Sequence, residues 1–138
     1  MVRPTDPLRT FDWDEPIYVD DTLSLRRLGR VLEQYRVGVV LVAHRSGAAS
    51  DAVGVVGERD LVAAIARDLD LDVATVADLV EREILTADAD ERVLDVARRL
   101  LDAGVRHVAV TRDDDIVAVL STRDLLAVLV DDIERRTN

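Results

Sequence analysis

Two kinds of hydrophobic pattern follow one another twice along the chain. Apolar residues recur three or four positions apart over 22–36 and again over 90–103, which predicts amphipathic helices. Short apolar runs at 38–43 and 52–56, and again at 106–111 and 116–120, are typical of buried strands. Further short strands are expected at 17–19 and 84–86, and closing helices after Gly57 and over about 122–135. Each half therefore has the order β-α-β-β-α, and the expected fold class is α+β.

The two long helices carry recognisable start and stop signals. One of Asp20, Asp21 and Thr22 is expected to cap the first helix, and Asp90 the second. Gly104 suits the left-handed position that ends the second helix. The expected buried faces are Leu25, Leu28, Leu32 and Tyr35 in the first helix, and Val93, Val96, Ala97, Leu100 and Leu101 in the second.

An internal duplication accounts for this repetition. Residues 54–62 align with 118–126 and residues 25–42 with 93–110, with an insertion in the first copy within 43–51. The expected organisation is an irregular arm at 1–16, a first repeat at 17–72, a linker at 73–82, a second repeat at 83–134 and a tail at 135–138. Two aromatic residues of the arm, Phe11 and Trp13, are expected to fold back onto the body.

Composition and charge exclude several classes of function. The chain of 138 residues has no cysteine, and all 18 of its basic residues are Arg, which rules out thiolate metal sites, disulfides and Lys-based chemistry. A net charge of −10 disfavours nucleic acid and anionic membranes as partners. With no signal peptide and no apolar run of membrane-spanning length, a cytoplasmic location is expected.

The junction between the last strand and the last helix is the main candidate for chemistry. The apolar run 116–120 stops at Ser121, and Asp124 follows three residues later, at a helix start that favours anionic or hydroxyl-bearing groups. The same spacing is that of a capping box, in which Asp124 only bonds back to Ser121. What favours a ligand site is the recurrence of the pattern as Gly57 and Asp60 in the first copy.

The two copies resemble tandem cystathionine-β-synthase (CBS) domains, the CBS pair or Bateman module, over about residues 17–134. The stretches that carry the resemblance are Ile84-Leu85-Thr86 followed by Asp90, residues 104–110, and the segments that end in Arg59-Asp60-Leu61 and Arg123-Asp124-Leu125. The resemblance implies a regulatory module rather than an enzyme. It also implies an adenosine-containing ligand such as AMP, ADP, ATP or S-adenosylmethionine, bound in clefts between the repeats.

The resemblance also implies the site residues. In the family pattern the Asp holds the ribose hydroxyls and the Ser or Thr assists, which assigns these roles to Asp124 and Ser121, while Arg106 faces phosphate. Thr122, Arg123 and Val119 complete this site, with Val37 and Ile17 from the other repeat. A weaker second site would comprise Asp60, Val55, Val105 and Ile84, because Gly57 and Gly38 replace its hydroxyl and cation. Trp13 would either stack on adenine or plug an empty cleft.

The last helix predicts a partner chain. Residues 125–130, beginning at Leu125, are apolar on all sides, and residues 61–66, beginning at Leu61, are similar. We expect a disc-like homodimer formed through these two helices.

Two other interpretations remain open at this point. One is a ligand-free structural or protein-interaction module that dimerises and whose clefts have degenerated. The other is an enzyme, but His44 and His107 have no nucleophile pattern beside them. The run 113–115 could bind a divalent cation, although a hairpin turn explains it better, and no metal is expected.

Overall fold

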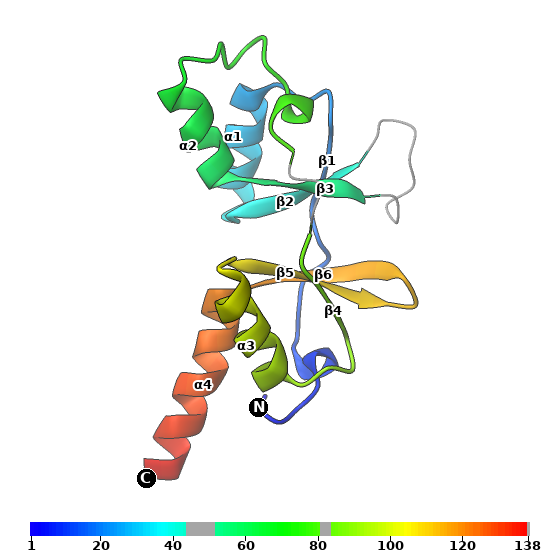
Figure 1. Cartoon of the computed structure of the whole chain (residues 1–138), viewed down its shortest axis with the longest axis vertical. Helices are drawn as coiled ribbons and strands as arrows, with labels where there is room; N and C mark the ends of the chain where they lie inside the picture. The colour runs from blue at the N-terminus through cyan, green and yellow to red at the C-terminus, as the bar shows by residue number, and fades with distance from the viewer. Residues whose placement is uncertain (44–51, 81–83, 138) are drawn as a thin grey trace. The chain divides into compact units, whose positions relative to one another are not determined.

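The computed structural model describes residues 1–43, 52–80 and 84–137. The chain forms two compact units, coloured by residue number in Figure 1. One unit is Pro16–Ile84, and the other combines Met1–Glu15 with Leu85–Asn138. Each unit contains a three-stranded sheet and helices, and each is described by itself below.

The unit Pro16–Ile84 contains the first repeat. Its elements are β1 (Tyr18–Asp20), α1 (Leu25–Tyr35), β2 (Val39–Ala43), β3 (Ala52–Gly57), α2 (Glu58–Ala66) and the short 3₁₀ helix η2 (Val76–Asp78). The sheet has the order β1-β2-β3, with β1 parallel to β2 and β2 antiparallel to β3. The core is built from aliphatic side chains: Val19, Leu25, Leu28, Leu32, Val40, Val42, Val56, Ala64 and Val76.

The other unit repeats this architecture. Its elements are the 3₁₀ helix η1 (Leu8–Thr10), β4 (Thr86–Asp88), α3 (Val93–Ala103), β5 (His107–Arg112), β6 (Asp115–Ser121) and α4 (Thr122–Thr137). The order β4-β5-β6 is again parallel and then antiparallel. Its core residues include Leu8, Val93, Val96, Leu100, Val108, Val110, Ala118, Leu120, Leu125 and Val128.

The duplication extends to the strand register. Tyr18 lies opposite Leu41 in the first sheet, and Thr86 lies opposite Ala109 in the second, which are equivalent positions of the two copies. Each antiparallel ladder also shifts register at the same place, between Val42 and Ala43 and between residues 110 and 111. The predicted α+β fold with two β-α-β-β-α repeats is confirmed.

The segment before each repeat packs on the other repeat. The arm runs beside the start of α3, where the Leu8 N–H donates to Glu91 O at 2.9 Å and the Val93 N–H donates to Asp6 O at 2.9 Å. These bonds satisfy a helix-start donor that has no partner within the helix. The arm thus belongs to the unit that contains the second repeat, and its only helix is η1.

Residues 71–77, which precede the second repeat, likewise pack beside the start of α1. The Val76 N–H donates to Leu23 O at 2.9 Å, and the Leu25 N–H donates to Ala74 O at 3.1 Å. Leu8 and Val76 occupy equivalent places in η1 and η2, and both are completely buried. The duplicated unit therefore includes these leading segments.

The two aromatic residues of the arm pack where the sequence led us to expect. Phe11 and Trp13 are partly buried against the core of the unit that contains Leu85–Asn138. A ring that would otherwise be solvated thereby gains apolar contact.

The helix starts differ from the predicted ones. Ser24, not Asp20, Asp21 or Thr22, caps α1, because its Oγ accepts the Arg27 N–H at 3.2 Å. Asp20 accepts the N–H and hydroxyl of Thr22 instead. Arg92 occupies the N-cap position of α3, and the predicted cap Asp90 pairs with Arg9 of the arm. A backbone carbonyl of the arm has taken over the expected role of Asp90.

Two residues predicted to be buried are exposed. Tyr35 in the last turn of α1 is 53% exposed, and Leu101 in α3 is 79% exposed. Both lie within one turn of the helix end, and neither side chain joins the buried core.

The turns carry left-handed residues at the expected places. Gly104 ends α3 with φ of 66°, and Arg36 ends α1 with φ of 54° at the equivalent position. Asp113 and Asp114 have φ of 52° and 69°, the signature of a tight hairpin turn between β5 and β6. The run 113–115 is therefore a hairpin. In the part of the chain that the structure describes, every helix is too short or too polar to cross a membrane.

Candidate functional site

The corner between β6 and α4 is held by reciprocal hydrogen bonds. The Ser121 N–H donates to Asp124 Oδ2 at 2.8 Å, and the Ser121 hydroxyl donates to the same oxygen at 3.0 Å. In return, Ser121 Oγ accepts the Asp124 N–H at 3.2 Å. This is a complete capping box, so the structural role of the pair is real.

The capping role does not use up the Asp124 carboxylate. A carboxylate offers about four acceptor positions. Two are occupied here, both on Oδ2, and the side chain is exposed. The remaining positions can accept two more hydrogen bonds, which is the number that a cis-diol donates. Because the proton of the Ser121 hydroxyl points to Asp124, Ser121 orients the carboxylate.

The backbone of an arginine adjoins the start of the same helix. The Thr122 N–H donates to Arg106 O at 2.8 Å, which joins Arg106, the residue before β5, to the first residue of α4. The Arg106 side chain is exposed and has no hydrogen bond or ion pair to any residue that the structure describes. An arginine anchored next to a helix start is suited to binding an anion there, because the helix start also favours negative charge.

Strand alternation adds apolar and polar neighbours to this corner. Val119 and Ser121 lie on one face of β6, while Ala118 and Leu120 on the other face are buried in the core. His107 of β5 lies directly opposite Ser121 in the ladder, so its half-buried side chain shares that face. His107 was not among the predicted ligand-binding residues. The predicted hairpin between 106–111 and 116–120 nevertheless placed it near Ser121.

The first repeat contains the same corner with fewer functional groups. The Gly57 N–H donates to Asp60 Oδ2 at 2.8 Å, and the Glu58 N–H donates to Gly38 O at 2.9 Å. These bonds are equivalent to those of Ser121 and Thr122. However, the hydroxyl and the guanidinium are missing, and Asp60 is half-buried rather than exposed.

The backbone at Gly57 has no room for a side chain. A Cβ atom added there would lie 2.5 Å from Gly38 O and 3.3 Å from Cγ2 of Val39. Non-bonded atoms do not approach so closely, so a serine at this position would require the backbone to move. The missing hydroxyl is thus tied to the close approach of residues 38 and 57.

The predicted site residues divide between the two units. Ser121, Thr122, Arg123, Asp124 and Arg106 gather at the start of α4, with Val119 on the adjoining strand. The same unit contains Val105, which is 41% exposed. The unit Pro16–Ile84 contains the remaining predicted residues, all half-buried: Ile17, Val37, Val55, Asp60 and Ile84.

Metal binding finds no support among residues 1–43, 52–80 and 84–137. No group of three or more His, Cys, Asp or Glu side chains there is arranged to hold a metal ion. His44, considered above for an enzyme, lies outside the described residues.

Comparison with known proteins identifies the family. A family model described as "CBS domain" matches residues 2–67 and 76–131. A search of curated proteins finds no match. Among solved structures, an uncharacterized conserved protein from Pyrococcus horikoshii is similar with a TM-score of 0.81 and 20% identity, over 91% of this chain and 93% of that one.

Two further structures were solved with ligands. A CBS domain protein from Pyrobaculum aerophilum, complexed with AMP, has a TM-score of 0.80 and 28% identity, over 91% of this chain and 96% of that one. A CBS domain pair in complex with 5′-methylthioadenosine and S-adenosyl-L-methionine has a TM-score of 0.80 and 19% identity, over 94% of this chain and 99% of that one.

Proposed function

Because this chain belongs to the CBS domain family, with both repeats matched, we propose that it is a regulatory module that senses an adenosine-containing ligand at the corner formed by Ser121 and Asp124. The candidates are AMP, ADP, ATP and S-adenosylmethionine. Similar CBS proteins solved with AMP, and with S-adenosyl-L-methionine and 5′-methylthioadenosine, support this ligand class.

The observation that carries the proposal is the half-used carboxylate of Asp124. Its Oδ2 is fixed by two bonds from Ser121, and its other acceptor positions are exposed to solvent. A carboxylate whose orientation is already set loses little freedom when it accepts the two hydroxyls of a ribose. Hydrogen bonds to a charged acceptor are also the stronger ones.

The neighbouring groups suit the other parts of such a ligand. Arg106 and the start of α4 can bind phosphate oxygens, and Val119 offers an apolar surface for a base. In this proposal Thr122 and Arg123 contribute to the same site, and Val37 and Ile17 supply further apolar contacts. The corner at Asp60, with Val55, Val105 and Ile84, is the weaker site, since it lacks both hydroxyl and cation.

Titration calorimetry with the four candidate ligands tests the proposal directly. We expect saturable binding of at least one of them, and we expect Asp124→Asn to abolish it. Asp60→Asn is the matched control, because it removes the equivalent carboxylate of the other repeat and should leave the stronger site intact. Failure of all four ligands to bind at millimolar concentration would refute the proposal and favour a module that acts only through protein contacts.

Signalling by such a module also needs a partner surface, and we propose a homodimer through α2 and α4. The outward sides of these helices carry apolar residues that are 43–65% exposed, namely Val62, Ile65, Leu126, Val130 and Ile133. Their inward sides, including Ala64, Leu125 and Val128, are already buried. Exposed apolar surface of this kind is typical of an interface.

Light scattering coupled to size exclusion measures this association. The wild type is expected at twice the mass of 15.3 kDa, and Leu126→Glu is expected to yield monomer. Leu101→Glu changes an exposed leucine of α3 and serves as the control that should remain dimeric. A wild type that is monomeric at micromolar concentration would contradict the dimer.

A further inference from the structure

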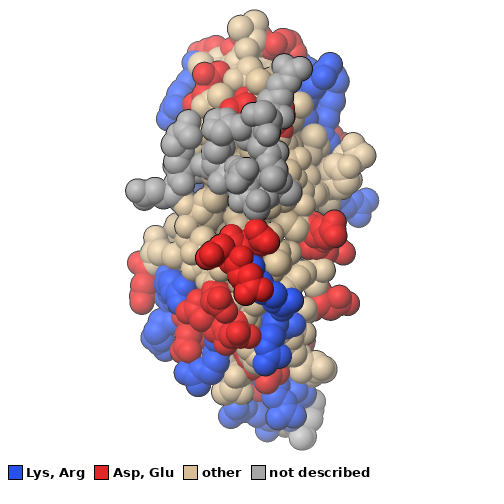
Figure 2. All heavy atoms as spheres, turned by 90° about the vertical axis from the view of Figure 1, so that its right-hand side faces the viewer, with Lys and Arg blue, Asp and Glu red and all other residues tan. Residues whose placement is uncertain are grey.

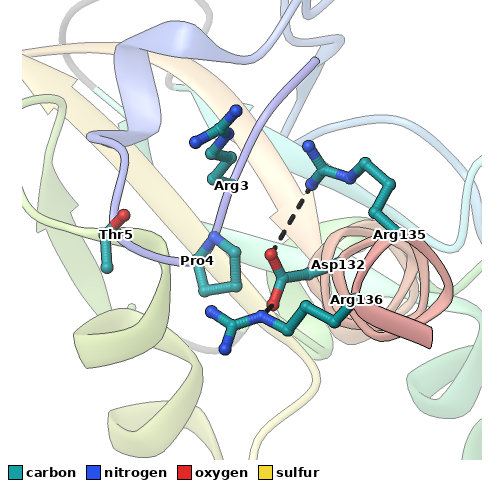
Figure 3. Close-up of a pocket in the computed structure, with 6 residues that line it drawn as sticks. All are labelled: Arg3, Pro4, Thr5, Asp132, Arg135 and Arg136. Atoms are coloured by element: carbon teal, nitrogen blue, oxygen red, sulfur yellow. Dashed lines mark ion pairs between the residues drawn. The ribbon is translucent and has the colours of Figure 1, made fainter. Parts of the chain in front are cut away.

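A small cavity lies at the far end of α4 from Asp124. Its volume is about 310 Å³, and it is lined by Arg3, Pro4, Thr5, Asp132, Arg135 and Arg136 (Figure 3). The arm and α4 belong to the same unit, so the cavity is formed within one unit. At a rise of about 1.5 Å per residue, Asp132 is roughly 12 Å along the helix from Asp124, and the two sites are separate.

The cavity is positively charged in an acidic protein. Three guanidinium groups against one carboxylate leave an excess of two positive charges, while the net charge of the chain is −10. The negative end of the helix macrodipole offsets only about half a charge of this excess. Figure 2 shows both acidic and basic side chains on one face of the molecule, whereas three of the four charged residues that line this cavity are arginines.

Asp132 holds two of the guanidinium groups in place. Its Oδ2 lies 2.9 Å from Nε of Arg136, and its Oδ1 lies 3.7 Å from Nη2 of Arg135. Figure 3 shows Asp132 between these two side chains, while Arg3, on the N-terminal segment, points its guanidinium to the same side as Arg135 and away from Arg136. The carboxylate therefore orients the arginines but satisfies only part of their hydrogen-bonding capacity, since each guanidinium has five N–H donors.

Donors of two side chains at the cavity make no hydrogen bond to the residues that the structure describes. Nη2 of Arg135 is buried and makes no hydrogen bond to any residue that the structure describes, although Nε of the same side chain donates to Asp131 O at 3.3 Å. The Arg3 side chain makes no hydrogen bond or ion pair within the described ranges either. Its backbone N–H donates to Asp6 Oδ2 at 2.9 Å, which fixes the turn that carries it. A buried donor without an acceptor is costly, and an added acceptor would remove that cost.

We propose that this cavity binds a small, doubly charged oxyanion of the phosphate class, either free phosphate or a phosphomonoester group. The planar fork of each Arg matches two oxygens of a tetrahedral oxyanion, and the Thr5 hydroxyl provides a further donor. The volume is at the lower end of the roughly 300–1,000 Å³ typical of small-molecule sites, which suits a compact anion.

Binding is tested on the full chain by titration with inorganic phosphate and with methyl phosphate, each against chloride at equal ionic strength. We expect saturable binding of at least one phosphate probe, and the tighter of the two identifies the source. Arg3→Ala and Arg135→Ala should each weaken binding about tenfold or more, because each removes a charge-assisted hydrogen bond. The control Arg98→Ala removes the same charge from an exposed position of α3 outside the cavity and should change affinity less than about twofold.

Three outcomes would overturn the proposal. These are equal effects of phosphate and chloride, equal losses in Arg98→Ala and Arg3→Ala, and complete loss of phosphate binding in Arg106→Ala. The last result would move the anion to the other end of α4, where Arg106 is the proposed phosphate ligand, whereas retained phosphate binding in Arg106→Ala supports the cavity whatever happens to adenosine ligands. Arg3→Ala should fold normally, since the Arg3 side chain makes no hydrogen bond or ion pair within the described ranges, and circular dichroism of the unliganded variant checks this.

Discussion

Substitution of Leu8 provides the sharpest test of whether the N-terminal arm folds with the second repeat. Its side chain is completely buried in the core cluster that contains Val93, Val96 and Leu100. The segment that carries it is tied down on both sides of the side chain, by Leu8 N–H to Glu91 O at 2.9 Å and Arg9 N–H to Ala89 O at 2.8 Å. The backbone therefore cannot collapse readily into a cavity left by Leu8→Ala.

The expected cost follows from that rigidity. Leu→Ala changes in cores cost about 2–5 kcal/mol, with the larger values at sites that cannot relax. We expect about 3 kcal/mol for Leu8→Ala. At roughly 4 °C per kcal/mol for a domain of this size, the midpoint of thermal unfolding should fall by about 12 °C.

Urea unfolding and hydrogen exchange together measure the effect. Amide hydrogen exchange should accelerate in α3 and β5, although these elements are more than 80 residues from Leu8 along the chain. The ion pair between Arg9 and Asp90, which are 81 residues apart, already joins these parts of the chain. Arg9→Ala is the control, because it breaks only an exposed ion pair and should cost less than about 1 kcal/mol. The reasoning fails if Leu8→Ala costs no more than Arg9→Ala, or if exchange accelerates first in α1.

Three further predictions test local features. Gly57→Ser should destabilise the protein in urea unfolding and should not create a second strong ligand site in calorimetry, because its Cβ would lie 2.5 Å from Gly38 O. Arg36→Gly should stabilise the protein by about 0.5–1 kcal/mol in the same assay, since Arg36 ends α1 with φ of 54° and Gly adopts that conformation without a penalty; an unchanged midpoint would contradict this. The hydrogen bond from Arg26 holds the pKa of Asp72 below its ordinary value, so the stability from this pair is present above the unfolded-state pKa and is lost as the pH falls through the lower folded-state pKa. Carbon NMR of the Asp72 carboxyl should show a titration midpoint below the ordinary aspartate value, and this midpoint should rise toward the ordinary value in Arg26→Ala.

Much of the fold was predictable because its signals are local or repeated. Helical periodicity over 93–103, the short apolar runs of the strands and the left-handed glycine at 104 are each read within a few residues. The duplication then allowed a helix or strand predicted weakly in one copy to be checked against the equivalent residues of the other copy. The capping box of Ser121 and Asp124 was predictable for the same reason, since its partners are three residues apart.

The errors arose where distant backbone atoms decide the structure. Asp90 was a good local candidate for the cap of α3, but the carbonyl of Asp6 accepts the Val93 N–H, and no periodicity reports a bond between those positions. Leu8 was not singled out from the sequence, because one buried residue among prolines and acids carries no periodicity. The alignment of Leu8 with Val76 was available in the sequence, yet one aliphatic pair is too little to extend a repeat.

The two corners also separate what the fold requires from what a ligand would require. In both repeats the residue at the strand end donates its N–H to the Asp carboxylate at 2.8 Å, although one of these residues is Ser121 and the other Gly57. That bond is therefore a property of the strand-to-helix turn and cannot by itself indicate function. The features peculiar to the second repeat are the Ser121 hydroxyl, the exposure of Asp124, and Arg106, whose side chain pairs with none of the residues that the structure describes. Asp124→Asn leaves only the Asp60 corner, and Asp60→Asn leaves only the Asp124 corner. Because the two corners share the same backbone hydrogen bond, the difference in ligand affinity between the two variants measures the contribution of those three features.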